Sequence, residues 1–317
     1  NCIKVVNDCN CLELVLNDLA TMDKWPFYIC TMNTMRFYFI IILLISLSFN
    51  AQVLAQSDEP VDAHISTEQL HLSMSIGAGV ITNPLYGADN IPLVIIPQIA
   101  FYGQQWFFDN GRVGYSIKQT QQHNLSLVTE LNPESRFFID WHPQNIFALK
   151  SASSNNQFTQ LETNTSPQQI NINNISKRKL VLDAGISYSF VAEQQMLSVQ
   201  ALHDVNSAYN GWRAAIQWQY HGQVGNLQLK PTVGVNYKSA QLNDYYYGLN
   251  SDETLLGKIV VGSSWQPYAK IDARWPLSKA NALRFHLAYY DYSAMDSSPL
   301  FERHYSTTAF IGFEHTF

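Results

Sequence analysis

The last thirteen residues of the chain, Tyr305 to Phe317, alternate in a pattern that predicts an extended strand. Apolar or aromatic side chains occupy most of the odd positions, and small or polar side chains occupy the even positions, with Phe310 as the exception. Successive side chains of a strand point to opposite faces, whereas the side chains of a helix repeat every 3.6 residues. We therefore expect a strand that separates an apolar environment from a polar one.

The same alternation returns along the chain from residue 71 onward, for example in residues 180–190, 212–221 and 227–238. Soluble strands are typically about 5–6 residues long, whereas a tilted strand needs about 9–11 residues to cross a bilayer. Most of these runs have the longer length, and Trp and Tyr stand near their ends. The pattern predicts an all-β fold, a transmembrane antiparallel β-barrel with apolar residues outside and charged residues in a wet lumen.

About twelve strands are expected, although the sequence also allows ten. The connectors alternate between short and long, as in outer-membrane barrels with short periplasmic turns and longer extracellular loops. The longest connector, 143–178, is rich in Asn, Gln, Ser and Thr. The expected strands are residues 71–80, 92–102, 106–117, 124–131, 136–142, 179–190, 196–204, 211–221, 226–238, 264–276, 282–291 and 304–317.

The region before the barrel has the features of an export signal. From Met35 a single Arg, a short apolar run and small residues ending at Ala55 match a secretory signal peptide, residues 35–55. Residues 1–34 are then expected to be an upstream translation artefact, 56–70 a periplasmic lead-in and 71–317 the barrel. All four cysteines lie before Met35, so the exported part is expected to have no disulfide and no thiol nucleophile.

Composition and spacing argue against two classes of function. The formal net charge is −6 and no basic stripe is present, which argues against a nucleic-acid partner. No adjacent Asp pair or nucleophile signature is found, and neighbours such as His203 and Asp204 would point to opposite faces of a strand. The nine His residues are scattered, without metal-ligand spacing. We expect no enzyme, no metal and no cofactor.

Three stretches in register resemble the MipA/OmpV family. The first comprises the glycine-rich residues 77–80, the loop 83–87 and the aromatic hairpin 106–111. The second is the tyrosine run 244–248, and the third is residues 298–300 before the closing strand. This resemblance implies an outer-membrane barrel in contact with lipid and lipopolysaccharide.

The resemblance also implies a function and a role for the chain end. The founding member of the family is regarded as a scaffold that bridges a lytic transglycosylase and a penicillin-binding protein, whereas other members are described as channel-like or adhesive. A scaffold is therefore expected, with a narrow solute channel or an adhesin as the alternative. The closing strand resembles those of outer-membrane barrels, in which the aromatic end, here Phe313 and Phe317, belongs to the barrel-assembly signal. The oligomeric state stays open.

Two groups of residues are candidates for the functional site. The loop formed by Tyr245, Tyr246, Tyr247 and Gly248 could be a recognition surface or a plug in the barrel mouth, because tyrosines serve in both roles. The charged residues Lys230, Asp272 and Arg284 are expected on the lumen face, where a channel would depend on them. The basic run 177–179 could contact lipopolysaccharide phosphates or act as an unspecific interfacial anchor.

Overall fold

The computed structural model describes residues 68–138, 169–255 and 257–317. The segments expected as an upstream artefact (1–34) and a signal peptide (35–55), and residues 56–67 of the lead-in, lie outside this part of the chain.

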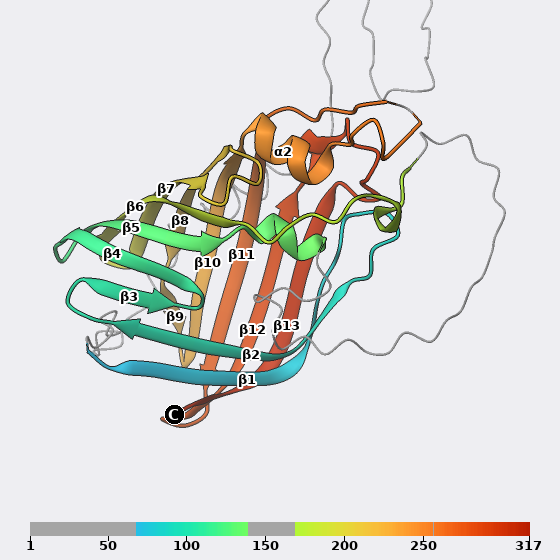
Figure 1. Ribbon diagram of the computed structural model, residues 1–317. Coiled ribbons are helices and arrows are strands. Elements are labelled where there is room, and N and C mark those ends of the chain that lie inside the picture. The colour runs from blue at the N-terminus through green and yellow to red at the C-terminus, as the bar shows by residue number, and fades with distance from the viewer. Residues whose placement is uncertain (1–67, 139–168, 256) are drawn as a thin grey trace, which may run out of the picture. The chain divides into compact units, whose positions relative to one another are not determined.

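Thirteen strands form one antiparallel sheet that closes on itself (Figure 1). Each strand pairs with its neighbour, β13 pairs with β1, and β10 pairs with β8 and β11, so twelve strands make the wall. The short β9 lies beside the start of β10. The predicted all-β barrel is confirmed. The strands are β1 Leu70–Ile81, β2 Ile91–Tyr102, β3 Trp106–Asp109, β4 Arg112–Gln119, β5 His123–Leu131, β6 Leu182–Ala192, β7 Gln195–Asp204, β8 Trp212–Tyr220, β9 Gly222–Val224, β10 Leu227–Lys238, β11 Ser264–Pro276, β12 Asn281–Asp291 and β13 Tyr305–Thr316.

The closing strand β13 has the expected two faces. Ile311 and Phe313 are exposed on the outside, whereas Gly312 and Glu314 are buried on the lumen side. Phe310, the exception in the pattern, is buried in the lumen because it lies over glycines. A Cβ atom at Gly79 would approach the Phe310 ring to 2.8 Å, so the absence of a side chain there makes room for the ring.

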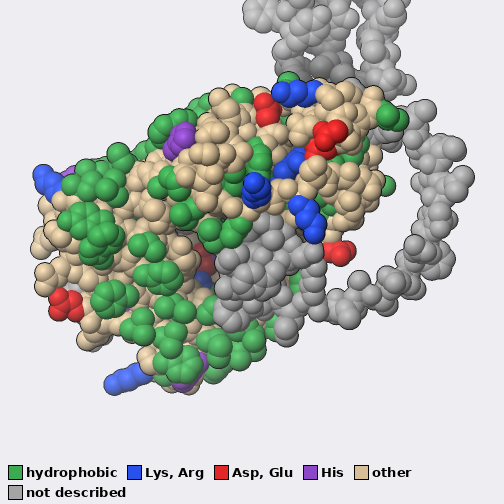
Figure 2. All heavy atoms as spheres, in the orientation of Figure 1, with side chains coloured by type: hydrophobic (Ala, Val, Ile, Leu, Met, Phe, Trp, Pro, Cys, Tyr) green, Lys and Arg blue, Asp and Glu red, His purple; other side chains and the backbone are tan. Residues whose placement is uncertain are grey.

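The outer face of the barrel matches a hydrocarbon environment. Hydrophobic side chains cover much of the flank in Figure 2, and several charged side chains gather near the end where Figure 1 places α2. Exposed aromatic residues lie at both strand ends, as in interfacial girdles. At the end with long loops they are Trp212, Trp265 and Tyr305, and at the end with short turns they are Phe101, Trp106, Trp275 and Phe317.

The expected single strand 106–117 is wrong, because the structure divides it into the hairpin β3–β4. Its turn is Asn110-Gly111, and both residues have positive φ, 49° and 88°. Asn-Gly is the preferred sequence for a two-residue hairpin turn, because both positions need the left-handed conformation.

The expected strand 136–142 is also wrong over residues 136–138, the part of it that the structure describes. Residues Pro133–Phe137 form the 3₁₀ helix η2, with Asn132 as its N-cap and Pro133 at its start, and residues 139–142 lie outside the described part. The two errors offset each other, so the expected count of twelve agrees with the wall. The other helices in the described ranges are η4 Ile172–Asn174, α2 Ala240–Tyr247 and η5 Ser293–Met295. Within the described residues, no helix combines the length and apolarity needed to cross a membrane.

Candidate functional site

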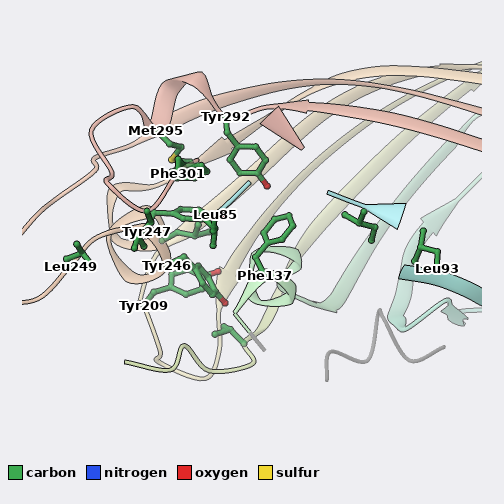
Figure 3. Packing of buried hydrophobic residues seen from close by; sticks show 14 of the residues in the cluster. Leu85, Leu93, Phe137, Tyr209, Tyr246, Tyr247, Leu249, Tyr292, Met295 and Phe301 are labelled. Carbon is green, nitrogen blue, oxygen red and sulfur yellow. The ribbon is translucent and has the colours of Figure 1, made fainter. Parts of the chain in front are cut away.

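A cluster of buried apolar and tyrosine side chains occupies the loop end of the barrel, and we call it the plug cluster (Figure 3). Tyr246 and Tyr247 have no exposed surface, and their rings pack with those of Phe138, Tyr209, Tyr292 and Phe301. The cluster comprises Ile81, Leu85, Leu93, Phe137, Val181, Tyr209, Leu242, Tyr246, Tyr247, Leu249, Tyr292, Met295, Leu300, Phe301 and Phe310.

Helix α2 carries the tyrosine run into this cluster. Ser239 caps its first turn by accepting from the Leu242 amide, and the Gly248 amide donates to the carbonyls of Asn243 and Asp244 at its end. Asn243 donates to the Gly262 carbonyl at 2.7 Å, and Asp244 accepts from the Val261 amide at 2.7 Å. The polar side chains of the helix therefore fix the following loop, while its tyrosines face the interior.

A buried ion pair joins η2 to the barrel wall beneath the plug cluster, and we call it the latch. Lys238 Nζ lies 2.8 Å from Glu134 Oε1, and both side chains are almost wholly buried. The hydroxyls of Tyr247 and Tyr292 donate to Glu134 Oε2, and the Lys238 ammonium lies 4.6 Å from the centre of the Tyr292 ring. Burial raises the pKa of Glu134, but Lys238 and Tyr247 outweigh it and hold that pKa below its ordinary value.

A second buried network lies on the wall formed by β5, β6 and β8. Arg213 donates to Glu130 at 2.5 Å and also to Asp183, which has no exposed surface. Asn132, the N-cap of η2, donates to Asp183 at 2.9 Å, and the Tyr209 hydroxyl donates to the other oxygen of that carboxylate at 2.5 Å. This network ties η2 and the plug cluster to the strands.

Below η2 and Tyr292 the lumen contains a polar chamber of about 400 Å³. Its wall is made mainly of hydroxyl and amide side chains from opposite strands, including Ser187, Ser198, Gln217, Asn236 and Gln266. Four basic residues, Arg112, Arg136, Arg213 and Lys270, and three carboxylates, Asp109, Glu130 and Glu134, also line it. The chamber has the size and the convergent polar groups of a site for a small molecule.

The structure places the predicted tyrosine loop largely inside the molecule. Tyr246 and Tyr247 belong to the plug cluster, whereas Tyr245 is half-buried and its hydroxyl accepts from the Lys179 amide at 2.8 Å. Gly248 is buried and closes α2. This burial favours the plug alternative, and a recognition role stays a prediction that concerns Tyr245.

The predicted lumen charges share the lumen face but lie outside the chamber wall. Asp272 accepts from His286 at 2.8 Å and lies 3.6 Å from Arg284, which in turn lies 3.6 Å from Glu314. Lys230 is exposed and stands opposite Asp272 in the β10–β11 ladder. Phe313 and Phe317 are exposed on the outside, and their role in assembly remains a prediction.

The latch residues Glu134 and Lys238 are absent from the sequence-based candidates. Asn132-Pro133 before Glu134 is a helix-start signal that could have identified η2. Nothing local shows that Glu134 and Lys238 meet, because they come from separate parts of the chain. In the described residues, no group of three or more His, Cys, Asp or Glu side chains could hold a metal ion.

Arg178, in the predicted basic run, is buried and paired. It lies 2.8 Å from Glu253 Oε1 and donates to the Gly248 carbonyl at 3.0 Å. Glu253 also accepts from the amides of Ser176 and Asn250. Burial raises the pKa of Glu253, but Arg178 and these amides lower it overall to about 2.

This lowered pKa predicts that the loops around Glu253 loosen in acid. A carboxylate with a depressed pKa contributes stability above its ordinary value, here 4.5, and loses it as the pH falls toward 2. The Ser176 and Asn250 amides should therefore lose protection from hydrogen exchange between about pH 4.5 and 2, after correction for intrinsic rates. Glu253→Gln should remove this pH dependence, and amides of β13 serve as the control. Unchanged protection across this range would contradict the prediction.

Comparison with known proteins places the chain among outer-membrane proteins. The family described as "MltA-interacting protein MipA" matches residues 76–317. The outer membrane protein YiaT of Escherichia coli is 24% identical over 244 residues, covering 75% of this chain and 89% of that protein. The MltA-interacting protein of Escherichia coli is 24% identical over 208 residues, covering 64% of this chain and 72% of that protein.

Solved structures with similar chains are also outer-membrane proteins. An outer membrane channel from Pseudomonas putida is 8% identical and aligns with 82% of this chain and 100% of its own, with a TM-score of 0.36. The named relatives and the closed barrel locate the protein in the outer membrane.

Proposed function

Because this chain belongs to the MltA-interacting protein family, we propose that its barrel is a non-catalytic scaffold for murein-remodelling enzymes. The first partner we propose is a lytic transglycosylase, as the name of the MltA-interacting protein suggests. The second is a penicillin-binding protein, as the family resemblance implies. Their place of contact is the periplasmic end, where outer-membrane barrels have their short turns.

The plug cluster is the observation that carries this proposal. A transport function needs a continuous path through the lumen, whereas here fifteen buried side chains cluster at its loop end. Tyr247 and the latch connect this packing to the wall through Glu134. A barrel filled in this way serves better as a rigid support for binding than as a conduit.

The short turns provide the exposed surface for such binding. They connect β2 to β3, β4 to β5, β6 to β7 and β11 to β12 at the end opposite α2. The turn at 120–122 is polar and exposed, and the turn at 277–280 carries Leu277, which is 56% exposed. An exposed apolar side chain within a polar surface is a common anchor at protein interfaces.

The polar chamber and the lumen charges favour a second candidate, a narrow solute channel. Lys230, Asp272 and Arg284 lie on the lumen face and would control the passage of ions. In a channel, Lys230→Met or Asp272→Asn would change conductance, whereas a scaffold would keep its partners after either change.

Crosslinked capture from intact envelopes, with conductance measured on the same preparation, tests the proposal. Recovery of a lytic transglycosylase or a penicillin-binding protein, together with no conductance, is the expected result. Clear ion conductance without any murein enzyme in the eluate would overturn the scaffold in favour of the channel.

A further inference from the structure

Two donors in the polar chamber have no hydrogen-bond partner in the described part of the protein. Gln266 is 2% exposed and its Oε1 accepts from Asn236 at 3.1 Å, whereas its Nε2 lies near the Tyr292 hydroxyl but makes no hydrogen bond of normal geometry. Arg112 donates to Gln200 at 3.3 Å, but its buried Nε has no hydrogen bond and lies 3.7 Å from Glu130 Oε2. Unpaired buried donors are costly, and a ligand with acceptor oxygens would satisfy them.

Lys270 adds a third donor, on the same strand as Gln266 and across the lumen from Arg112. Gln266, Tyr268 and Lys270 follow one another at every second position of β11, so all three line the chamber. The Lys270 ammonium lies 5.0 Å from the centre of the Tyr268 ring, and no ion pair joins it to another described residue. Among the described residues, the chamber atoms without a hydrogen bond are thus donors, and Lys270 is a cation with no carboxylate partner, whereas Arg112 is ion-paired with Glu130.

The charges that face the chamber leave a cationic excess. Glu134 is neutralised by Lys238, and Glu130 is shared between Arg213 and Arg112. Asp109 accepts from the side chain of Asn110 at 2.8 Å. With Lys238 and Asp183, which pair with lining residues from outside the lining, five basic residues stand against four carboxylates, so one positive charge is in excess and the chamber favours an anion.

Tyr268 gives the chamber a fixed aromatic wall. Its ring stacks on Tyr290 at 5.3 Å with an interplanar angle of 27°, and its hydroxyl donates to Gln217 at 2.9 Å. The ring reaches across β10 at Gly234, where a Cβ atom would lie 2.6 Å from it. Because Tyr268 is 4% exposed, it offers only a narrow aromatic strip, and the hydroxyl and amide groups beside it are what suit the polar groups of a sugar ring.

We propose that the chamber binds a small carboxylated saccharide. The carboxylate would accept hydrogen bonds from Lys270 and Gln266 on β11, while the ring hydroxyls would bond to serines such as Ser187 and Ser198 and to Arg112 on the opposite side of the chamber. A volume of about 400 Å³ suits a ligand of this size. Inorganic phosphate would satisfy the donors but would leave the tyrosine wall and the hydroxyl groups unused. This site does not depend on the scaffold function, because it lies inside the lumen and away from the turns.

Calorimetric titration of the folded protein in detergent tests this site, with N-acetylmuramic acid, N-acetylglucosamine and inorganic phosphate as probes. N-acetylmuramic acid should bind, and N-acetylglucosamine, which lacks the carboxylate, should bind at least about tenfold more weakly, because a hydrogen bond to a charged group contributes about 1.5–3 kcal/mol. Lys270→Met and Gln266→Leu should each weaken binding of the acid by about tenfold or more for the same reason.

Lys230→Met is the matched control, because it removes another lumen lysine, on the neighbouring strand and outside the chamber wall. Heat-modifiable electrophoretic mobility shows that each variant is folded. Equal binding of both sugars, preference for inorganic phosphate, or binding that Lys270→Met and Gln266→Leu leave unchanged would overturn the proposal, as would the absence of binding by every probe.

Discussion

Lys238→Met is expected to lower the free energy of unfolding by about 3–5 kcal/mol, because it leaves a buried carboxylate without its partner. Glu134 is almost wholly buried, and its remaining contacts are the hydroxyls of Tyr247 and Tyr292. Two hydroxyls cannot replace a full positive charge, so the carboxyl will take up a proton or the plug will shift. Urea unfolding of the protein refolded in lipid vesicles measures the change.

The double variant Glu134→Gln with Lys238→Met should recover much of this loss. A neutral amide still bonds to the tyrosine hydroxyls and needs no counter-charge, so the two changes should not add. Lys230→Met, which alters an exposed lumen lysine, should change the unfolding free energy by less than about 1 kcal/mol. A Lys238→Met variant as stable as Lys230→Met would show that the latch contributes nothing to the fold.

Arg213→Met is expected to have an effect of similar size, about 3–5 kcal/mol, because two carboxylates lose their common partner. Asp183 is fully buried and keeps only the bonds from Asn132 and Tyr209, while Glu130 keeps the more distant Arg112. The loss should be measured by the same urea unfolding, and the hydrogen-exchange protection of η2 should fall with it, since Asn132 caps that helix.

Arg274→Met is the matched control for Arg213→Met. Arg274 is also a lumen arginine paired with a carboxylate, Glu314 at 2.7 Å, but its side chain is 32% exposed and Glu314 keeps Arg284 nearby. The cost there should be about 1 kcal/mol or less. Equal losses for the two variants would mean that burial does not determine how much the Arg213 network contributes to the free energy of unfolding.

The wall of the barrel could be predicted from the sequence because each residue of a strand between lipid and a wet lumen faces one or the other. Apolar and polar side chains must therefore alternate along the strand. β13 shows this well, since its exposed and buried positions alternate as the sequence suggested. The exception, Phe310, could not be explained in advance, because the room for its ring comes from Gly79 on the neighbouring strand. The error at 106–117 was avoidable, since Asn110-Gly111 is a strong turn signal inside an otherwise continuous run.

The interior of the barrel was much less predictable. The tyrosine run could be identified as either a plug or a surface, because an amphipathic side chain suits both places. Only the packing of α2 against Phe138, Tyr292 and Phe301 distinguishes them. The latch and the Arg213 network join residues that are distant in the chain, and single charged residues on strands carry no signal of their partners.

Exchange of the short turns, followed by crosslinked capture from envelopes, tests the central claim most directly. Replacing 120–122 and 277–280 with unrelated turn sequences should abolish recovery of the lytic transglycosylase or penicillin-binding protein, while the barrel stays folded. Replacing Asp252 and Leu255, both exposed at the loop end, should leave capture unchanged. Capture that survives the turn exchange but is lost on changing Asp252 and Leu255 would contradict a periplasmic scaffold.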